Sequence, residues 1–380
     1  MILTMRMQIC KIAQTIAQNL AQNKSKQMSI TIHDIAAKAG VSLSTVSRVL
    51  NGKAKKYRIS PKTEETILHF AEELNYRPNK MAQGLRLKKS HTIGLVVPDI
   101  SNPFFAYVTR VIQTKAYEMG YSLIVCNTNE DLSTEIEQIE LMKSKVIDGF
   151  IVMPVGTDYR HLETLIRKKH PLVLLDRCFD ALQTSSVVVD NYEGAYLATA
   201  YLIECGHKKI GIIQGLPDTY TNTERMRGYL DALRENNIEV KSQYIVGKDY
   251  RRESGYIETK LLLNLEERPT AIFTTSDLIT LGALQAIVED NYKIPDDISI
   301  VSFDDTDFAP FLFSPLTAVR QPKELMGEIA VKMLIDAMNG ENATEKQRII
   351  LKSQLVKRAS VKNFNPVPVS ANSFSGNSNH

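Results

Sequence analysis

From His91 onward, short apolar runs alternate with longer segments in which apolar residues recur at helical spacing. The apolar runs have few polar interruptions, which is typical of parallel strands that helices cover on both faces. The predicted strands are 93–97, 123–125, 149–152, 172–175, 210–213, 271–273 and 300–303, and the predicted helices are 104–119, 134–145, 161–169, 192–205, 225–235, 255–264 and 278–290. The alternation restarts near residue 190, so we predict a body of two doubly wound parallel-sheet α/β subdomains that bind ligands at the carboxyl ends of their strands.

Residues 31–76 show a different pattern, in which short amphipathic segments are separated by a tight turn and a loop. Gly40 follows the first segment and tolerates the positive φ that a sharp turn requires. Ser42 and Ser60 each precede a segment and can cap it. The predicted helices are 32–39, 43–50 and 61–74. We therefore expect an all-α head with a helix-turn-helix.

The change of pattern along the chain divides it into regions. The predicted regions are 1–28, a poorly ordered extension; 29–76, the helix-turn-helix domain; 77–89, a hinge helix or linker; 90–362, a ligand-binding and dimerisation domain; and 363–380, a disordered tail. Within the large domain, we expect residues 90–189 and 320–362 to form one subdomain and residues 190–319 to form the other.

The charge is distributed unevenly along the chain. The whole sequence has 46 Lys and Arg against 43 Asp and Glu, a net charge of +3. Residues 29–89 hold 12 of the cations and 5 of the acids, which is +7, so the remainder carries −4. A basic end on a slightly acidic body indicates a polyanionic partner, although a solvated basic surface would look the same.

Several separate motifs occur in an order and spacing that resemble the lactose/galactose-repressor (LacI/GalR) family. They are Thr31-Ile32-His33-Asp34-Ile35-Ala36-Ala37-Lys38-Ala39-Gly40-Val41-Ser42-Leu43-Ser44-Thr45-Val46-Ser47-Arg48-Val49-Leu50-Asn51-Gly52, then Leu74-Asn75-Tyr76-Arg77-Pro78-Asn79 and Ala82-Gln83-Gly84-Leu85-Arg86. The resemblance continues across the α/β body to about Val361. It implies a periplasmic-binding-protein-like body and a DNA-binding transcriptional regulator, most simply a repressor that an effector releases from its operator.

The resemblance assigns DNA contacts to the second helix of the head. It implies that Leu43 and Ser44 face the bases and that Arg48, beside Ser47, donates to a guanine edge. Phosphate contacts are expected from Thr31, Ser42, Thr45, Asn51 and Lys53. A three-helix core without a DNA role is the alternative, but it does not explain why small and polar residues gather in one turn.

In the hinge, the resemblance places Leu85 where a leucine enters the minor groove, and it adds Tyr76, Asn79 and Ala82 to the predicted contacts. Gly84 weakens a helix by about 1 kcal/mol relative to alanine, which suits a segment that folds only on DNA. A flexible linker is the alternative. The basic loop 52–59 fits DNA-backbone contact and a solvated charged surface equally well.

Polar and aromatic residues follow the predicted strands of the body. The predicted ligand-binding residues are Asn102, Phe104, Phe105, Asp176, Arg177, Arg225, Tyr250, Ser276 and Asp304. The resemblance implies that the loop with Asn102, Phe104 and Phe105 lines the ligand cleft. It also implies that Arg225, which opens a helix after Gln214-Gly215, holds the ligand and that Tyr250 provides an aromatic platform. Forked donors and acceptors with an aromatic face suit a sugar or a sugar derivative. Each residue taken alone also has a structural explanation, as a cap, an ion pair or a half-buried ring.

The sequence offers little for other classes of protein. No nucleophile elbow or phosphate-cradling GKS/T motif occurs, so we predict no enzyme, no cofactor and no metal site. Polar residues interrupt the first 20 positions, which argues against export and against a sugar-binding protein of the transport type, the main alternative. We expect a cytoplasmic homodimer whose partners are a pseudo-palindromic double-stranded operator and a small-molecule effector, with no membrane contact.

Overall fold

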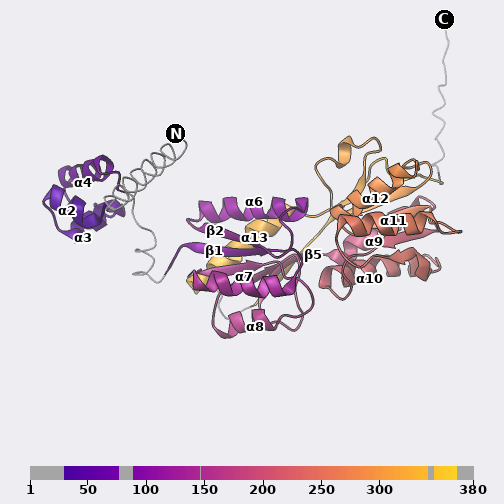
Figure 1. The fold of residues 1–380 in the computed structure, drawn as a ribbon, viewed down its shortest axis with the longest axis horizontal. Helices are drawn as coiled ribbons and strands as arrows, with labels where there is room; N and C mark the ends of the chain where they lie inside the picture. Colours follow the sequence, from indigo (N-terminus) through magenta and orange to yellow (C-terminus); the bar gives the residue numbers. More distant parts are fainter. Residues whose placement is uncertain (1–29, 77–88, 146, 341–345, 366–380) are drawn as a thin grey trace, which may run out of the picture. The chain divides into compact units, whose positions relative to one another are not determined.

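The computed structural model describes residues 30–76, 89–145, 147–340 and 346–365. The chain divides into two compact units, Met1–Arg86 and Leu87–His380 (Figure 1). The proposed extension 1–28 and nearly all of the proposed hinge 77–89 lie outside the described residues. So does the tail from residue 366 onward.

The first unit contains the helix-turn-helix head. Its helices are α2 (Ile32–Ala39), α3 (Leu43–Leu50) and α4 (Pro61–Glu73). Their apolar faces meet in a small core around Ile35, Val46, Val49 and Ile67, all of which are buried. This three-helix arrangement confirms the pattern predicted from the apolar spacing.

Local capping sets the ends of these helices. Gly40 has φ 64°, in the left-handed region, and its N–H donates to the carbonyl of Ala36. The side chains of Ser42 and Ser60 accept hydrogen bonds from the backbone N–H groups of Thr45 and Thr63. The predicted turn and both predicted caps are therefore confirmed.

The second unit begins with a lobe built on a parallel sheet in the order β11-β5-β4-β3-β1-β2. Its strands are β1 (Thr92–Val97), β2 (Ser122–Asn127), β3 (Gly149–Val152), β4 (Leu172–Leu175), β5 (Ser185–Val189) and β11 (Arg348–Leu351), and its helices are α6 (Pro103–Glu118), α7 (Leu132–Ser144), α8 (Arg160–Arg167) and α13 (Lys323–Asn339). Helices α6 and α13 cover one face of the sheet, and α7 and α8 cover the other (Figure 1). Burial on both faces explains the continuous apolar runs in these strands.

The other lobe repeats this architecture in the order β12-β10-β9-β8-β6-β7. Its strands are β6 (Ile210–Ile213), β7 (Ile245–Val246), β8 (Ala271–Thr274), β9 (Ser299–Phe303), β10 (Thr317–Arg320) and β12 (Gln354–Val356), and its helices are α9 (Asn191–Glu204), α10 (Tyr220–Glu235), α11 (Arg252–Leu263) and α12 (Asp277–Glu289). All of these strands pair in parallel except β12, which runs antiparallel to β10. The prediction of two doubly wound subdomains is confirmed.

The chain passes between the two lobes three times: from β5 to α9, from β10 to α13, and from β11 to β12. The predicted assignment of residues to the two subdomains was wrong after the passage from β11 to β12. Strand β12 joins the second sheet, and Val361 packs in the second core, although both were assigned to the first subdomain. β12 pairs with β10 through tertiary contact, and three residues carry too little periodicity to reveal that partner.

Several elements escaped the pattern analysis, namely β5, β7, β10, β11, β12 and α13. In addition, α10 begins at Tyr220, so Arg225 lies inside this helix and does not open it. Phe364 was predicted to lie in a disordered tail, but its N–H donates to the Cys205 carbonyl at 2.8 Å. In the part of the chain that the structure describes, no helix is long and apolar enough to cross a membrane.

Candidate DNA-contacting head and effector site

Helix α3 has one buried face and one exposed face. Val46 and Val49 point into the core of the head, whereas Leu43, Ser44 and Arg48 are exposed. The residues expected to face bases therefore lie on the free surface of α3. Small side chains on the first turn allow close approach to a groove.

Three hydroxyl groups cluster on the first turn of α3. The Ser42 hydroxyl oxygen lies 2.8 Å from that of Ser44 and 2.9 Å from that of Thr45, and it accepts from the Thr45 N–H at 3.2 Å. Helix amino termini favour anions because their N–H groups and dipole point outward. This turn therefore combines exposed hydroxyls with a positive potential, as phosphate contact requires.

The predicted base-contacting arginine packs against the basic loop. The guanidinium carbon of Arg48 lies 4.1 Å from the ring centroid of Tyr57, within cation–π range. The Lys53 N–H donates to the Arg48 carbonyl at 2.8 Å, and Ala54 is buried in the head. The loop 52–59 is thus attached to α3, while Lys55, Lys56 and Arg58 remain exposed.

The other predicted DNA contacts have mixed surroundings. Thr31 is exposed at the start of α2, where its N–H and hydroxyl donate to Asp34 at 2.7 and 2.8 Å. Asn51 donates through Nδ2 to the Ser47 carbonyl at 2.6 Å, and Tyr76 packs half-buried on the head's core. The predicted contacts Asn79, Ala82 and Leu85 lie outside the described residues.

In the second unit, all nine predicted ligand-binding residues line a single cavity between the two lobes. The described residues of its lining are Asn102, Phe104, Phe105, Asp176, Arg177, Thr221, Arg225, Tyr250, Ser276, Asp304 and Gln321. They come from loops and helix starts at the carboxyl ends of strands in both sheets. Parallel sheets place ligand sites at this end of their strands.

Local backbone geometry directs several of these side chains. Asn102 caps α6 by accepting the Phe104 N–H at 2.8 Å. Asp176 and Asp304 each follow a strand with φ values of 66° and 81°, in the left-handed region. Such a conformation costs a non-glycine residue roughly 1–3 kcal/mol, and it often accompanies a functional site.

Two contacts hold the lobes together across the cavity. Asn102 Nδ2 of the first lobe donates to Asp277 Oδ1 of the second at 2.9 Å. The Arg177 guanidinium carbon lies 5.3 Å from the Tyr250 ring centroid. The cavity measures about 30 Å³, whereas small-molecule pockets usually measure about 300–1,000 Å³. The structure is therefore a closed form, and an effector can enter only if the lobes or these side chains move apart.

Both arginines of the cavity are buried and already paired. Arg177 donates to the two carboxylate oxygens of Glu130 at 2.8 and 2.7 Å. Burial alone would lower the pKa of Arg177, but Glu130 outweighs burial and raises it. Arg225 donates to Asn191 Oδ1 at 2.8 Å and to the Thr275 carbonyl at 2.5 Å.

Two buried acids at the cavity hold their protons more tightly than usual. Burial raises the pKa of Asp176 to about 6, even though Arg177 and Arg225 act in the opposite direction. Burial and the neighbouring Asp304 raise the pKa of Asp277 to about 7. Removal of the carboxylates from water is the main cause of both shifts, and the charge of Asp304 adds to each.

One glycine allows the aromatic wall to approach the second lobe. A Cβ atom on Gly215 would lie 2.1 Å from the ring of Tyr250, so the ring could not keep this position beside any other residue. The hydroxyl of Tyr250 lies 2.9 Å from that of Thr221. The ring therefore lies directly on the backbone that follows β6.

Four residues of the site were not predicted from the sequence: Thr221 and Gln321 in the lining, and Glu130 and Asp277 behind it. Thr221 is one helical turn before the predicted Arg225, and Glu130 is in the loop after a predicted strand. Both positions could therefore have been predicted from the sequence. Gln321 follows β10, a strand that the pattern analysis did not detect.

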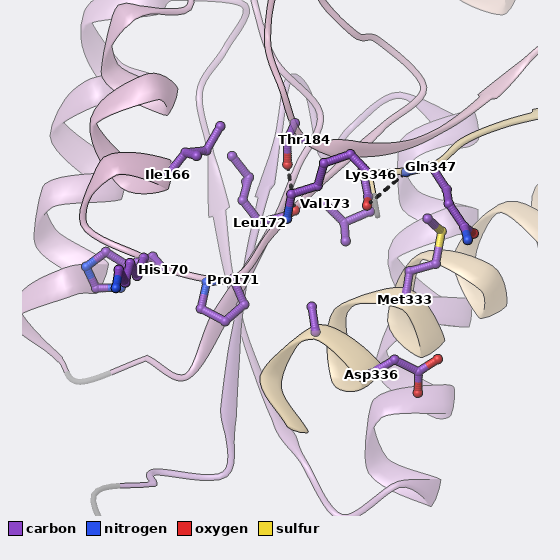
Figure 2. Close-up of a pocket in the computed structure, with 13 residues that line it drawn as sticks. Ile166, His170, Pro171, Leu172, Val173, Thr184, Met333, Asp336, Lys346 and Gln347 are labelled. Carbon is purple, nitrogen blue, oxygen red and sulfur yellow. Dashed lines mark hydrogen bonds between the residues drawn. The ribbon is translucent and has the colours of Figure 1, made fainter. Parts of the chain in front are cut away.

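A wider hollow of about 500 Å³ lies at the opposite end of the first sheet (Figure 2). Its described lining includes Lys169, His170, Met333, Asp336 and Lys346, but no Phe or Tyr. The hollow is near the amino ends of β4 and β5, away from the edge where parallel sheets bind ligands. We therefore assign the effector site to the smaller cavity.

Comparisons with known proteins agree with this architecture. Residues 31–79 match the family model of bacterial regulatory proteins of the lacI family, and residues 199–361 match a periplasmic binding protein-like domain. The HTH-type transcriptional repressor PurR of Mannheimia succiniciproducens is 35% identical over 335 residues, covering 87% of this chain and 98% of that protein. Catabolite control protein A of Priestia megaterium is 36% identical over 315 residues, covering 83% and 94%.

Solved structures extend the match. The lac repressor dimer bound to operator and the anti-inducer ONPF has a TM-score of 0.78 at 27% identity, covering 88% of this chain and 99% of that one. The regulator CelR in complex with cellobiose has a TM-score of 0.66 at 30% identity, covering 87% and 99%. The chain therefore belongs to the lacI family of bacterial regulatory proteins, and it is a DNA-binding transcriptional repressor whose two-lobed body responds to a small-molecule effector.

Proposed function

We propose that this repressor binds a sugar or a sugar derivative in the cavity between its lobes and that occupancy changes its affinity for a pseudo-palindromic operator. The observation that carries the proposal is the convergence of nine residues on one interlobe cavity. These residues were selected by their positions after predicted strands and by the resemblance to the LacI/GalR family. Release of the operator on effector binding is the expected direction. The protein acts in the cytoplasm by binding alone, without catalysing a reaction.

The chemistry of the cavity supports a sugar. Phe104, Phe105 and Tyr250 offer apolar ring faces, and Asn102, Asp176 and Asp304 offer hydrogen-bonding groups for hydroxyls. Similar structures include the CelR–cellobiose complex at 30% identity and an Enterococcus faecium regulator with bound ribose at 27%. Closure of two lobes around a ligand is also a common source of a two-state response.

The exposed surface of α3 supports the assignment of the DNA contacts. Leu43, Ser44 and Arg48 are the proposed base contacts, and Ser47 lies beside them. The proposed phosphate contacts are Thr31, Ser42, Thr45, Asn51 and Lys53. Further proposed DNA contacts are Tyr76, Asn79 and Ala82, with Leu85 entering the minor groove. In a homodimer, two such heads would contact two half-sites about one helical turn apart.

The test is a selection from randomised duplex DNA with the purified protein, with and without a panel of free sugars. Enrichment of a palindrome that one sugar weakens would support both parts of the proposal. Enrichment of a palindrome that no sugar alters would support the proposed operator binding but contradict the proposed sugar effector. Sugar binding without any enriched DNA would contradict the regulatory proposal and favour a protein that only binds its ligand.

Arg48→Ala separates base recognition from general attraction to DNA. We expect this variant to lose about 1–3 kcal/mol of discrimination at one position of each half-site, because a guanidinium can bond a guanine edge through two donors. Lys62→Ala is the control, since Lys62 is also exposed and cationic but lies on α4. Anisotropy titrations with single-base operator variants provide the measurement. Equal losses at every position would show that Arg48 contacts only the backbone.

A further inference from the structure

The charges around the cavity favour a particular class of effector. Arg177 and Arg225 are the cations in its described lining, and Asp176 and Asp304 are the acids. Glu130 and Asp277 are bonded directly to lining residues. The two cations therefore face four carboxyl groups, which leaves no excess positive charge for an anionic ligand.

Glu130 is paired with Arg177, one of the two cations that could otherwise bind an anionic effector. Its two carboxylate oxygens accept from Arg177 at 2.8 and 2.7 Å, which is the two-pronged geometry that a phosphate would otherwise take. The Pro154 carbonyl accepts from the same guanidinium at 3.2 Å, and Asp176 Oδ2 lies 3.7 Å from its Nε. Arg177 is 5% exposed, so solvent does not weaken these interactions.

Arg225 is also largely engaged. Its guanidinium carbon lies 3.6 Å from the ring centroid of Phe303, and its Nε and Nη1 donate to Asn191 Oδ1 and the Thr275 carbonyl. Burial raises the pKa values of two acids of the site, Asp176 and Asp277, and the negative charge of Asp304 raises both further. A further anion in this space would meet the same repulsion.

The unpaired atoms of the lining indicate what the effector must offer. Among the described lining residues, Arg177 Nε and Gln321 Oε1 are buried without a hydrogen-bond partner. One is a donor and the other an acceptor. A hydroxyl group can satisfy both, because it accepts and donates, whereas ionised phosphate oxygens mainly accept.

On the basis of the proposed effector function, we infer that the effector is an uncharged, hydroxyl-rich compound, and that Glu130 excludes phosphorylated compounds by occupying Arg177. Glu130 acts as a specificity residue from behind the cavity. Selection against a ligand by unfavourable charge is a general source of specificity.

The first arm of the test is calorimetric titration of the full-length protein with matched pairs: ribose and ribose 5-phosphate, and glucose and glucose 6-phosphate. A sugar phosphate carries about −1.5 to −2 charges at neutral pH. We expect the free sugar to bind at least roughly 100-fold more tightly than its phosphate, since like charges at close range disfavour binding strongly. Equal or tighter binding of a phosphorylated sugar would overturn the inference.

Glu130→Gln tests the role of the specificity residue. The amide keeps the shape and one acceptor for Arg177 but removes the negative charge. The ratio of the Kd of the sugar phosphate to the Kd of the free sugar should therefore fall by about tenfold or more. Glu137→Gln is the control, because Glu137 is exposed on α7 and the change in net charge is the same. An unchanged preference in Glu130→Gln would assign the selectivity elsewhere and overturn the proposed role.

The second arm uses inorganic phosphate and does not depend on the identity of the effector. We expect phosphate to raise the melting temperature of Glu130→Gln but not that of the wild-type protein or of Glu137→Gln. If no sugar of either form binds, the proposed sugar sensing fails, and this arm alone decides the inference. The inference would be overturned if phosphate raised the melting temperatures of wild type and Glu130→Gln equally, or raised neither.

Discussion

At the scale of single residues, the second lobe contains an unusual acid. Asp277 is buried, accepts hydrogen bonds through Oδ1 from Asn102 of the other lobe and from the Leu278 N–H, and leaves its Oδ2 without a partner. Burial and the proximity of Asp304 raise its pKa from 3.8 to about 7. The folded protein therefore binds this proton at pH values where the unfolded chain has released it. The resulting stability is complete below about pH 4 and is lost as the pH rises to 7 and beyond.

Asp277→Asn should remove this dependence on pH. We expect the variant to gain stability relative to wild type as the pH rises from 5 to 8, by roughly 2–4 kcal/mol at the upper end, because a neutral amide has no proton to lose. Thermal unfolding of both proteins across this range gives the difference. Asp218→Asn, at an exposed position with φ 63°, should show no such trend. A constant difference between Asp277→Asn and wild type would mean that Asp277 is ionised throughout.

At the scale of secondary structure elements, glycines set how closely helices pack in the second lobe. A Cβ atom on Gly282 of α12 would lie 2.0 Å from the Arg252 carbonyl oxygen of α11. Reciprocally, a Cβ atom on Gly255 of α11 would lie 2.1 Å from the Ile279 carbonyl oxygen of α12. Both obstacles are backbone atoms, which cannot turn aside as a side chain can. The two helices lie against each other because neither has a side chain at the crossing.

Gly282→Ala should therefore destabilise the body, although alanine is the better helix former. We expect a loss of about 3 kcal/mol or more, since the added methyl group must push two packed helices apart. Val288→Ala, on the exposed surface of the same helix, serves as the control and should change stability by less than about 1 kcal/mol. Urea unfolding measures both effects. A fully stable Gly282→Ala would show that the two helices separate easily.

At the scale of the whole molecule, two binding events share one chain. The repressor binds operator DNA through its head and a small molecule through its body, and the two influence each other through the protein alone. Such coupling is thermodynamically reciprocal: a ligand that weakens operator binding must itself bind more weakly to the operator-bound protein. A ligand can shift the balance only by its difference in affinity for the two states.

This reciprocity gives a quantitative prediction for the homodimer. The factor by which a saturating effector changes the operator Kd should equal the product of the factors by which the operator changes the affinities of the two effector sites. Anisotropy titrations give the first quantity, and calorimetry with and without operator gives the second. Unequal values would mean that the effector also binds elsewhere, or that it changes the assembly state of the protein.

The sequence alone was sufficient to predict the features that depend on neighbouring residues. Gly40, Ser42 and Ser60 set helix ends through contacts within a few positions, and the apolar periods marked most of the strands and helices. It also predicted nine ligand-site residues, some from their positions after strands, because parallel strands bring their carboxyl ends to one edge, and the others, such as Arg225 and Tyr250, from the family resemblance. The chain indeed brings these nine residues to one cavity.

The tertiary structure decided which residues meet across long separations. Asn102 and Asp277 are 175 positions apart, and neither neighbourhood in the sequence indicates the other. The partnership of Glu130 with Arg177 and the placement of β12 in the second sheet are of the same kind. The contact of Asn102 with Asp277 and the placement of β12 depend on the passage of the chain between the lobes, whereas Glu130 and Arg177 meet within the first lobe. In each case the partners lie close in space but share no local periodicity. Closure of the cavity, and the charge balance inside it, arise only once those distant segments pack together.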